Sequence, residues 1–338
     1  MHPDVFDHRP ARGIVLGLCL GLYVAQATAD ESVRDGADSP APAAEARADA
    51  APSVAALAFV EPVPGHFVHV GAHADMHEGN GGDIAVGGFV VGTRSVAVID
   101  PGGSVALGRA FARAVRARTP LPVSHVVLTH FHPDHVFGAA AFVGAGVAVL
   151  AHANFVRART QRGGFYAERF AALLDGLGRE ALVAPTLEVG VGEPRTIELG
   201  ERRLQLVAHP TAHTDNDLTL FDPDARVLWA GDLLFEGRTP ALDGSLLGWL
   251  DVIDSLAALE PRLAVPGHGE PGPLEPMLEA QRRYLRDLLE NTRAALASGA
   301  SLSERLLEAE RERAPHWALF AMQHPTNVTR AWTELEWE

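Results

Sequence analysis

The stretch Thr129-His130-Phe131-His132-Pro133-Asp134-His135 places three imidazoles and a carboxylate within six consecutive positions. It follows an apolar run, residues 126–128, that is typical of a buried strand. Side chains two positions apart on an extended segment point the same way, so we expect His130 and His132 to face one metal ion. We expect Asp134 and His135, where the chain turns, to face a second ion.

The donor atoms of this stretch suit particular metals. Neutral imidazole and carboxylate, without thiolate, suit zinc and also iron or manganese. The alternative is a surface cluster of histidines on a turn. Three later residues favour a metal site, because each is polar, follows a strand-like run and has Gly or Pro close by: His213, Asp232 and His268. Strand ends are where a rigid sheet presents ligands to a shared crevice.

Composition sets broad limits on the class of protein. The chain has 338 residues, enough for one large domain or two ordinary ones. Its apolar fraction of 47% is normal for a protein that buries a core. The formal net charge of -15 argues against nucleic acid or an anionic membrane surface as a partner. The chain contains Arg but no Lys, which excludes catalysis by a lysine amine.

Residues 1–29 have the features of a signal peptide. Arg9 and Arg12 precede the apolar run 13–24, and Ala27-Thr28-Ala29 forms a small-x-small cleavage site. The run is short for a membrane span, so we expect cleavage rather than an uncleaved anchor, and no stable span in the mature chain. The single cysteine, Cys19, lies inside this run. The mature chain would therefore contain no disulfide and no thiolate ligand.

The remaining chain predicts a linker followed by one domain. Residues 30–58 are rich in Ala, Pro, Asp and Glu and predict a disordered linker. Residues 59–338 predict a folded domain that ends in a helical extension. Helical patterns cover 105–118, 246–259 and 277–297, and 154–177 is mainly helical with an interruption at Gly163-Gly164. Strand-like runs cover 67–70, 84–91, 95–99, 123–128, 147–150, 195–199, 204–207, 218–221, 227–230 and 263–265.

The order of strands and helices indicates an α/β protein with two sheets face to face and helices outside. Pattern alone does not separate this arrangement from a doubly wound sheet. The order of motifs separates the two arrangements. H-x-H-x-D-H, then H-T, then G-D, then G-H-G resembles the metallo-β-lactamase superfamily over residues 67–271. The resemblance implies an αβ/βα four-layer sandwich for residues 59–338.

The resemblance also implies seven metal ligands in two groups that share one carboxylate: His130, His132 and His213 for the first ion, Asp134, His135 and His268 for the second, and Asp232 for both, as in glyoxalase-II-like hydrolases. Asp134 and Asp232 are the ligands to which we also assign catalytic roles. True zinc β-lactamases of the commonest class carry Cys where this chain has Asp232. Together with the absence of Lys, which removes their usual carboxylate anchor, this difference argues against antibiotic hydrolysis as the main role.

The chemistry implied by the resemblance is hydrolysis. Two Zn²⁺ ions about 3.5–4 Å apart, or iron or manganese in their place, would share a bridging hydroxide that attacks an ester, thioester, lactone or amide. Metal coordination lowers the pKa of water toward about 7, which makes hydroxide accessible at neutral pH. The ions, their two aspartates and the hydroxide leave a net positive charge. We therefore expect a neutral or anionic small-molecule substrate.

Other stretches carry a narrower resemblance. Five stretches resemble the quinoprotein relay system zinc metallohydrolases: Glu236-Gly237-Arg238-Thr239-Pro240, Leu242-Asp243-Gly244-Ser245, Trp249-Leu250, His324-Pro325-Thr326-Asn327-Val328-Thr329 and the ending Leu335-Glu336-Trp337-Glu338. This resemblance implies a periplasmic protein with a functional link to a quinoprotein dehydrogenase system. It does not identify a substrate.

Two alternatives stay open. A mononuclear iron sulfur dioxygenase of the same superfamily would use His130, His213 and Asp232 and leave the second group empty, whereas the presence of that second group favours two metals. A non-catalytic metal-binding accessory protein is the other alternative, because a complete site is necessary for catalysis without proving it.

Several charged residues remain outside the predicted ligand set. We expect His209 to be structural or to support a ligand. His66, His69, His73 and His77 either line the mouth of the site or face solvent in loops, and we favour solvent. Asp100 is expected to cap a turn or to hold a ligand histidine. Arg238 fits a substrate contact and a loop ion pair equally well.

Overall fold

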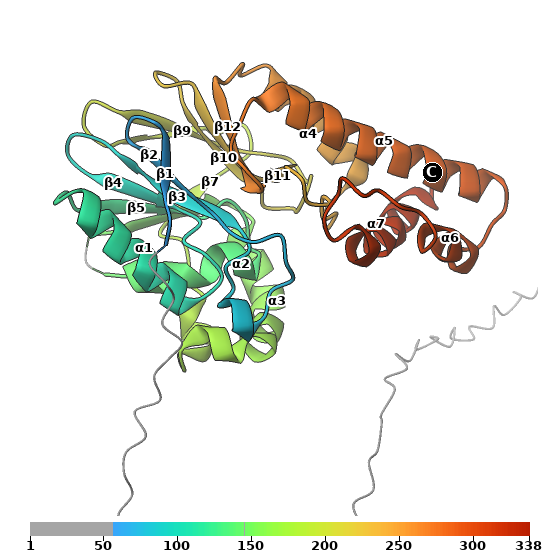
Figure 1. Ribbon diagram of the computed structural model, residues 1–338, viewed down its shortest axis with the longest axis horizontal. Coiled ribbons are helices and arrows are strands. Elements are labelled where there is room, and N and C mark those ends of the chain that lie inside the picture. Colours follow the sequence, from blue (N-terminus) through green and yellow to red (C-terminus); the bar gives the residue numbers. More distant parts are fainter. Residues whose placement is uncertain (1–56, 145) are drawn as a thin grey trace, which may run out of the picture. The chain divides into compact units, whose positions relative to one another are not determined.

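The computed structural model describes residues 57–144 and 146–338 (Figure 1). The predicted signal peptide and residues 30–56 of the predicted linker lie outside the described residues. Within the described part, no helix combines the length and the apolar character that a membrane crossing requires. The last two residues of the predicted linker contact the folded domain: Leu57 packs against the core, and the Ala58 carbonyl oxygen lies 2.9 Å from Nδ1 of His69.

The first sheet has seven strands whose spatial order follows the sequence. The strands are β1 (Val60–Val63), β2 (His66–Val70), β3 (Val86–Val91), β4 (Val96–Ile99), β5 (Val123–Val127), β6 (Ala148–His152) and β7 (Leu187–Val189). Strands β1 to β4 pair antiparallel, and β4 to β7 pair parallel. Because parallel strands end at the same edge of a sheet, the loops that follow β4 and β5 lie side by side.

The second sheet has five strands in the order β12-β11-β10-β9-β8. The strands are β8 (Arg195–Glu198), β9 (Arg203–Ala208), β10 (Leu218–Asp222), β11 (Val227–Phe235) and β12 (Leu263–His268). Only β11 and β12 pair parallel in this sheet, and the other neighbours are antiparallel. The parallel pair delivers Asp232 and His268 from adjacent strands.

The helices fall into two sets (Figure 1). The first set precedes the second sheet in the chain and comprises α1 (Val105–Arg118), α2 (Pro133–Val136), α3 (Phe155–Arg169) and the short 3-10 helices η1 (Glu78–Asn80), η2 (Phe137–Phe142), η3 (Ala171–Leu174) and η4 (Gly178–Ala181). The second set follows β11 and comprises α4 (Leu246–Ala257), α5 (Leu274–Ala297), α6 (Leu302–Ala309) and α7 (Phe320–Leu335).

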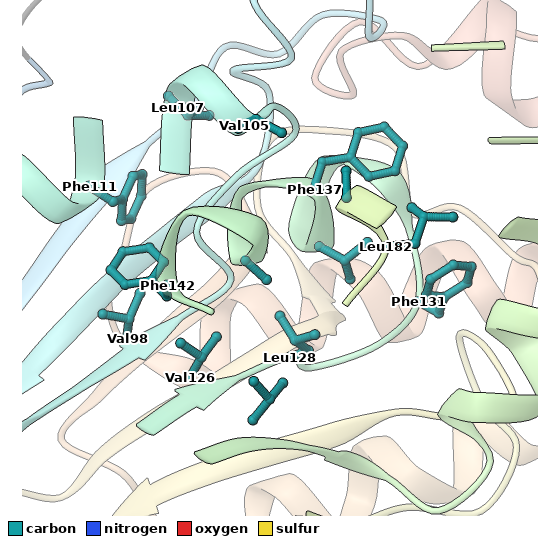
Figure 2. Packing of buried hydrophobic residues seen from close by; sticks show 14 of the residues in the cluster. Val98, Val105, Leu107, Phe111, Val126, Leu128, Phe131, Phe137, Phe142 and Leu182 are labelled. Carbon is teal, nitrogen blue, oxygen red and sulfur yellow. The ribbon is translucent and has the colours of Figure 1, made fainter. Parts of the chain in front are cut away.

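Three apolar clusters hold these layers together. One joins the facing surfaces of the two sheets and includes Val68, Val127 and Trp229. A second lies between the first sheet and its helices, where Phe111 and Phe142 pack near Val98 and Val126 (Figure 2). A third joins the second sheet to α4, α5 and α7. The layers are therefore helix, sheet, sheet, helix, which confirms the predicted αβ/βα sandwich.

Three details differ from the sequence-based expectation. α3 runs without interruption through Gly163-Gly164. β11 continues to Phe235, five residues beyond the expected end, and all nine of its residues are buried. β1 and β7 were not predicted, because four-residue and three-residue strands give too short an alternation to detect.

Candidate metal centre

The seven residues predicted as ligands lie together in two adjacent groups. His130, His132, His213 and Asp232 form one, and Asp134, His135 and His268 form the other. Within each group, one ligating atom per residue lies within 4.8 Å of the others. The loop after β5 supplies the first part of both groups, because α2 begins at Pro133, directly after His132, and carries Asp134 and His135 in its first turn.

Asp232 lies between the two groups. Its Oδ2 is 3.4 Å from Nε2 of His213 and 3.8 Å from Nε2 of His130. Its Oδ1 is 3.1 Å from Nε2 of His135, and Oδ2 is also 3.4 Å from Nε2 of His268. One carboxylate thus approaches histidines of both groups, as a bridging ligand would.

The backbone of β11 explains how Asp232 reaches this position. The pairing of β11 with β12 shifts register on both sides of Gly231, whose φ of 53° is in the left-handed region. Such a bulge turns the next side chain out of the regular alternation. A Cβ on Gly267 would lie 1.9 Å from Oδ1 of Asp232. Glycine at this position is therefore required for the carboxylate to lie where it does.

The three histidines of the first group present unprotonated nitrogens to a common point. Nδ1 of His132 lies 3.0 Å from Nε2 of His130 and 3.1 Å from Nε2 of His213. The opposite ring nitrogens have acceptors: the Asp243 carboxylate for His132, the Ala241 carbonyl for His213 and the Thr129 hydroxyl for His130. A ring nitrogen that donates outward leaves the inward nitrogen with a lone pair. Three such lone pairs repel each other unless a cation or a proton lies between them.

The second group is oriented in the same way. Nδ1 of His135 lies 2.9 Å from Oδ2 of Asp100, and Nδ1 of His268 lies 2.7 Å from the Ile84 carbonyl. Asp100 also accepts hydrogen bonds from the backbone and hydroxyl of Thr129, at 2.8 and 2.6 Å. Its φ of 43° is in the left-handed region, which Asp tolerates better than most residues. Asp100 therefore holds His135 and the start of the metal loop together.

Burial and charge act in opposite directions on the ionisable groups. Burial lowers the pKa of His213 to about 4 and that of His130 well below its usual value, which favours neutral imidazole. Burial alone would lower the pKa of His135 too, but nearby carboxylates, above all Asp232, raise it well above the usual value. Burial alone would raise the pKa of Asp232, yet the surrounding imidazoles, His268 first, hold it well below the usual range. The carboxylates thus favour positive charge at the centre, which a divalent cation would supply in place of protons.

Two buried polar atoms at the junction of the two groups also fit a metal ion. Nε2 of His135 and Oδ1 of Asp232 are buried and face each other at 3.1 Å, and in the described part of the chain neither makes a hydrogen bond of good geometry. Buried polar atoms without partners are rare and costly. Both atoms lie at the junction of the two groups, where a cation would satisfy them. The donor set is imidazole and carboxylate, which suits zinc, iron or manganese.

Several other histidines belong to neither metal group. Nε2 of His209 lies 2.8 Å from the Thr219 hydroxyl, and the residue belongs to neither group. Our preference for solvent was wrong for His66 and His69. Both lie on β2 and are buried, with Nε2 at 3.0 Å from Asp222 and 2.8 Å from Asp83 respectively. His73 and His77 are exposed.

Arg238 lies beside the second group. Its Nη1 is 2.7 Å from Nδ1 of His268, so its positive charge borders the site. Asp243 is the residue that sequence reasoning missed: its Oδ2 lies 3.1 Å from Nε2 of His132 and its carboxylate also accepts hydrogen bonds from Arg162 and Arg330. Its stretch, residues 242–245, carries the narrower resemblance, but no local pattern predicts these contacts, because the partners lie 81 to 111 positions away in the chain.

A pocket of about 490 Å³ opens next to the first group. His132 forms part of its wall, and the other lining residues come from α3, from the loop after β11 and from α7. The pocket places a space for a small molecule against the metal centre.

Comparison with known proteins agrees with this geometry. A family model described as metallo-beta-lactamase superfamily matches residues 81–268, more than half of the chain. Hydroxyacylglutathione hydrolase of Acidiphilium cryptum (strain JF-5) is 30% identical over 186 residues, which cover 54% of this chain and 63% of that protein. The human acyl-coenzyme A thioesterase MBLAC2 is 31% identical over 154 residues, which cover 41% of this chain and 48% of that protein.

Solved structures share the fold. The stereoselective inverting sec-alkylsulfatase Pisa1 from Pseudomonas sp. has a TM-score of 0.63 at 18% identity, covering 82% of this chain and 50% of that one. The matched regions thus span about half to two thirds of the length of these relatives.

Proposed function

The chain belongs to the metallo-beta-lactamase superfamily, and on that premise we propose that it is a dinuclear zinc-dependent hydrolase exported to the periplasm. Its substrate is a small neutral or anionic molecule with an ester, thioester, lactone or amide bond. The names of the relatives support cleavage of an ester-type bond, since they describe a hydrolase, a thioesterase and an alkylsulfatase.

One observation carries this proposal. Three histidines converge on one point with their outward nitrogens already hydrogen-bonded, and a single carboxylate connects them to a second set of donors. A solvated histidine cluster would not need an acceptor for each outward nitrogen. Such outer partners are typical of metal ligands, because they fix the tautomer and the ring orientation.

The assignment of roles follows from position and exposure. His130, His132 and His213 would hold one ion, Asp134, His135 and His268 the other, and Asp232 would contact both. When bound, the ions would supply a nucleophile from water at neutral pH and polarise the scissile bond. The side chain of Asp134 is 12% exposed and that of Asp232 is 4% exposed. Burial alone would raise the pKa of the Asp134 carboxyl, but His135 and His268 hold it below its usual range, so we assign both carboxylates to holding the ions and positioning the attacking water.

The link to a quinoprotein dehydrogenase system is part of the proposal. It rests on the resemblance of residues 236–245 and 324–329 to the quinoprotein relay metallohydrolases. These two segments are packed together, because the side chain of Asn327 bonds the Pro240 carbonyl at 2.6 Å and the Leu242 amide at 3.0 Å. They also lie next to the metal centre, so the shared sequence features belong to the site. The net charge of -15 supports a small-molecule partner rather than nucleic acid.

Two measurements on the purified mature chain test the function. Elemental analysis should find about two zinc ions per chain. A turnover screen with thioester, lactone, carboxylic ester, sulfate ester and phosphoester substrates should find hydrolysis that a chelator abolishes and added zinc restores. A single iron with no second ion at saturating zinc would favour the sulfur dioxygenase. Two bound ions with no turnover would favour the accessory role.

A further inference from the structure

The pocket beside the metal centre has two arginines in its lining. Arg162 on α3 and Arg330 on α7 both donate hydrogen bonds to the carboxylate of Asp243, Arg330 at 2.9 Å from Oδ1. The same carboxylate accepts from Nε2 of His132 at 3.1 Å. All four residues line the pocket, and Asp243 connects the two arginines to the metal-centre residue His132.

The charge of this cluster favours an anion. Two guanidinium groups face one carboxylate, which leaves a net positive charge before any metal ion is counted. Each guanidinium has five N–H donors in a planar fork, and the bonds to Asp243 come from Nη1 of Arg162 and Nη2 of Arg330. The side chains of Arg162 and Arg330 are 38% and 53% exposed, so their remaining donors can reach a ligand in the pocket.

The rest of the lining is largely apolar. Phe165 and Tyr166 on α3 and Leu242 on the facing loop contribute side chains to the pocket. Phe165 is 65% exposed, so its ring is accessible to a ligand in the pocket. An aromatic wall next to paired guanidinium groups suits a ligand that has an apolar body and one charged end.

One wall of the pocket lies outside the residues that the family model matches. The family match ends at His268, whereas Gln323, Thr326 and Arg330 belong to α7. The matched region therefore holds the metal ligands and eight of the eleven lining residues, and α7 supplies the other three.

We propose that this pocket binds an amphipathic organic anion, with its anionic group on Arg162 and Arg330 and its apolar body against Phe165 and Tyr166. The inference deepens the proposed hydrolase function, on which it rests, by naming the substrate class: an ester or thioester of a small apolar acid that carries one further anionic group. Asp243 is the positioning residue, because it holds the two arginines and His132 in fixed relation.

Binding of hexanoate and of its neutral analogue hexanamide tests the pocket without any turnover. Isothermal titration calorimetry is done on the mature chain after chelation, so that carboxylate cannot bind a metal ion. Wild type should bind hexanoate at least about tenfold more tightly than hexanamide, and Arg330→Gln should reduce hexanoate affinity about five- to tenfold while hexanamide is unaffected. Arg162→Gln should have the same effect on hexanoate affinity, and Arg330→Lys should retain part of the preference for hexanoate over hexanamide.

The control is Arg109→Gln, which removes an exposed arginine paired with Asp175 on another face of the first sheet's helices. It should leave both affinities unchanged. Equal affinity of wild type for the two ligands, or undetectable binding of hexanoate, overturns the proposal. So does a hexanoate affinity that neither arginine substitution changes.

Turnover separates failure of this inference from failure of the hydrolase function. The metal-loaded chain is offered para-nitrophenyl hexanoate and the mono-para-nitrophenyl ester of adipic acid, which differ by a terminal carboxylate. Arg330→Gln should raise KM for the adipate ester about tenfold more than it raises KM for the hexanoate ester. Hydrolysis of both esters without a carboxylate preference refutes the pocket assignment alone. Absence of hydrolysis with a hexanoate preference in calorimetry refutes the hydrolase function alone.

Discussion

Asp232 has a position that no other residue of the site shares, because its two oxygens approach histidines of both groups. If it bridges two ions, it fixes their separation and offsets part of their repulsion. Asp232→Ala removes both effects but leaves three protein ligands for each ion, which is an ordinary catalytic coordination. We expect activity to fall at least about a hundredfold, and metal content by elemental analysis to fall much less.

His209→Ala is the matched control for Asp232→Ala. His209 is buried four positions before His213, yet its Nε2 faces the Thr219 hydroxyl. Its removal should leave metal content and neutral-pH activity close to wild type. Loss of a metal in His209→Ala together with full activity in Asp232→Ala would show that the ligands of this half of the site are wrongly assigned.

Asp100 acts on the metal centre through His135. Asp100→Asn keeps a residue type that tolerates the left-handed backbone but weakens the acceptor for Nδ1 of His135. Loss of such an outer partner usually costs about 10- to 100-fold in metal affinity. Competition with a chromophoric zinc chelator should show this loss for one of two ions.

Asp222→Asn is the comparison for Asp100→Asn. Asp222 pairs with Nε2 of His66 in a similar buried pair, but His66 belongs to neither metal group. Zinc affinity in this variant should match wild type. Equal losses in the two variants would mean that Asp100 affects the metal only through general stability.

At the scale of elements, α7 supports the loop that orients the ligands. Asn327 on α7 is fully buried, and its side chain bonds the Pro240 carbonyl, the Leu242 amide and the Tyr284 hydroxyl. The loop between Pro240 and Leu242 provides the carbonyl that accepts from His213. Asn327→Ala leaves several buried polar groups without partners, so we expect a loss of about 2–4 kcal/mol in the free energy of unfolding, measured in urea.

Thr333→Ala, an exposed substitution on the same helix, controls for the effect of helix propensity. It should change the free energy of unfolding by less than about 0.5 kcal/mol. If Asn327→Ala were as mild, α7 would not support the loop in the way that its contacts indicate.

The local signals in the sequence account for much of the fold. α1 has the predicted bounds because Ser104 caps it and its apolar residues repeat at helical spacing. The predicted ligands lie together although they come from both sheets: four follow β5, His213 follows β9, and Asp232 and His268 lie on the adjacent strands β11 and β12. What could not be predicted depends on contacts between distant segments. β11 has a bulge at Gly231 and continues past Asp232. Asp243 contacts Arg162 and Arg330 only in the folded chain.

At the scale of the whole molecule, the sequence predicts a mature chain shorter than the full chain. The charged start, the short apolar run and the small residues at 27–29 predict cleavage after Ala29. N-terminal sequencing of the protein recovered from the periplasm should begin at Asp30. A sequence that begins near Met1 would show that the N-terminal segment is retained.

Buried neutral histidines make the stability of the whole sandwich depend on pH. His66 joins the two sheets through Asp222, and His209 bonds within the second sheet while its carbonyl lies 3.1 Å from Nε2 of His152 at the end of β6. Burial lowers the pKa of all three, that of His209 to about 4. The unfolded chain, with histidine near pKa 6.5, therefore binds more protons than the folded chain as pH falls below about 6.5.

It follows that stability is lost as pH falls from about 6.5 toward 4. The shift of His209 alone corresponds to about 3 kcal/mol at the lower end. His209→Gln removes this titration but keeps a side chain that can bond Thr219. Urea unfolding of the chelated mature chain at about pH 7 and pH 4.5 should show a smaller loss for His209→Gln than for wild type, by about 2–3 kcal/mol. If both proteins lost the same free energy, His209 would not be neutral in the folded chain, and the acid sensitivity would come from other groups.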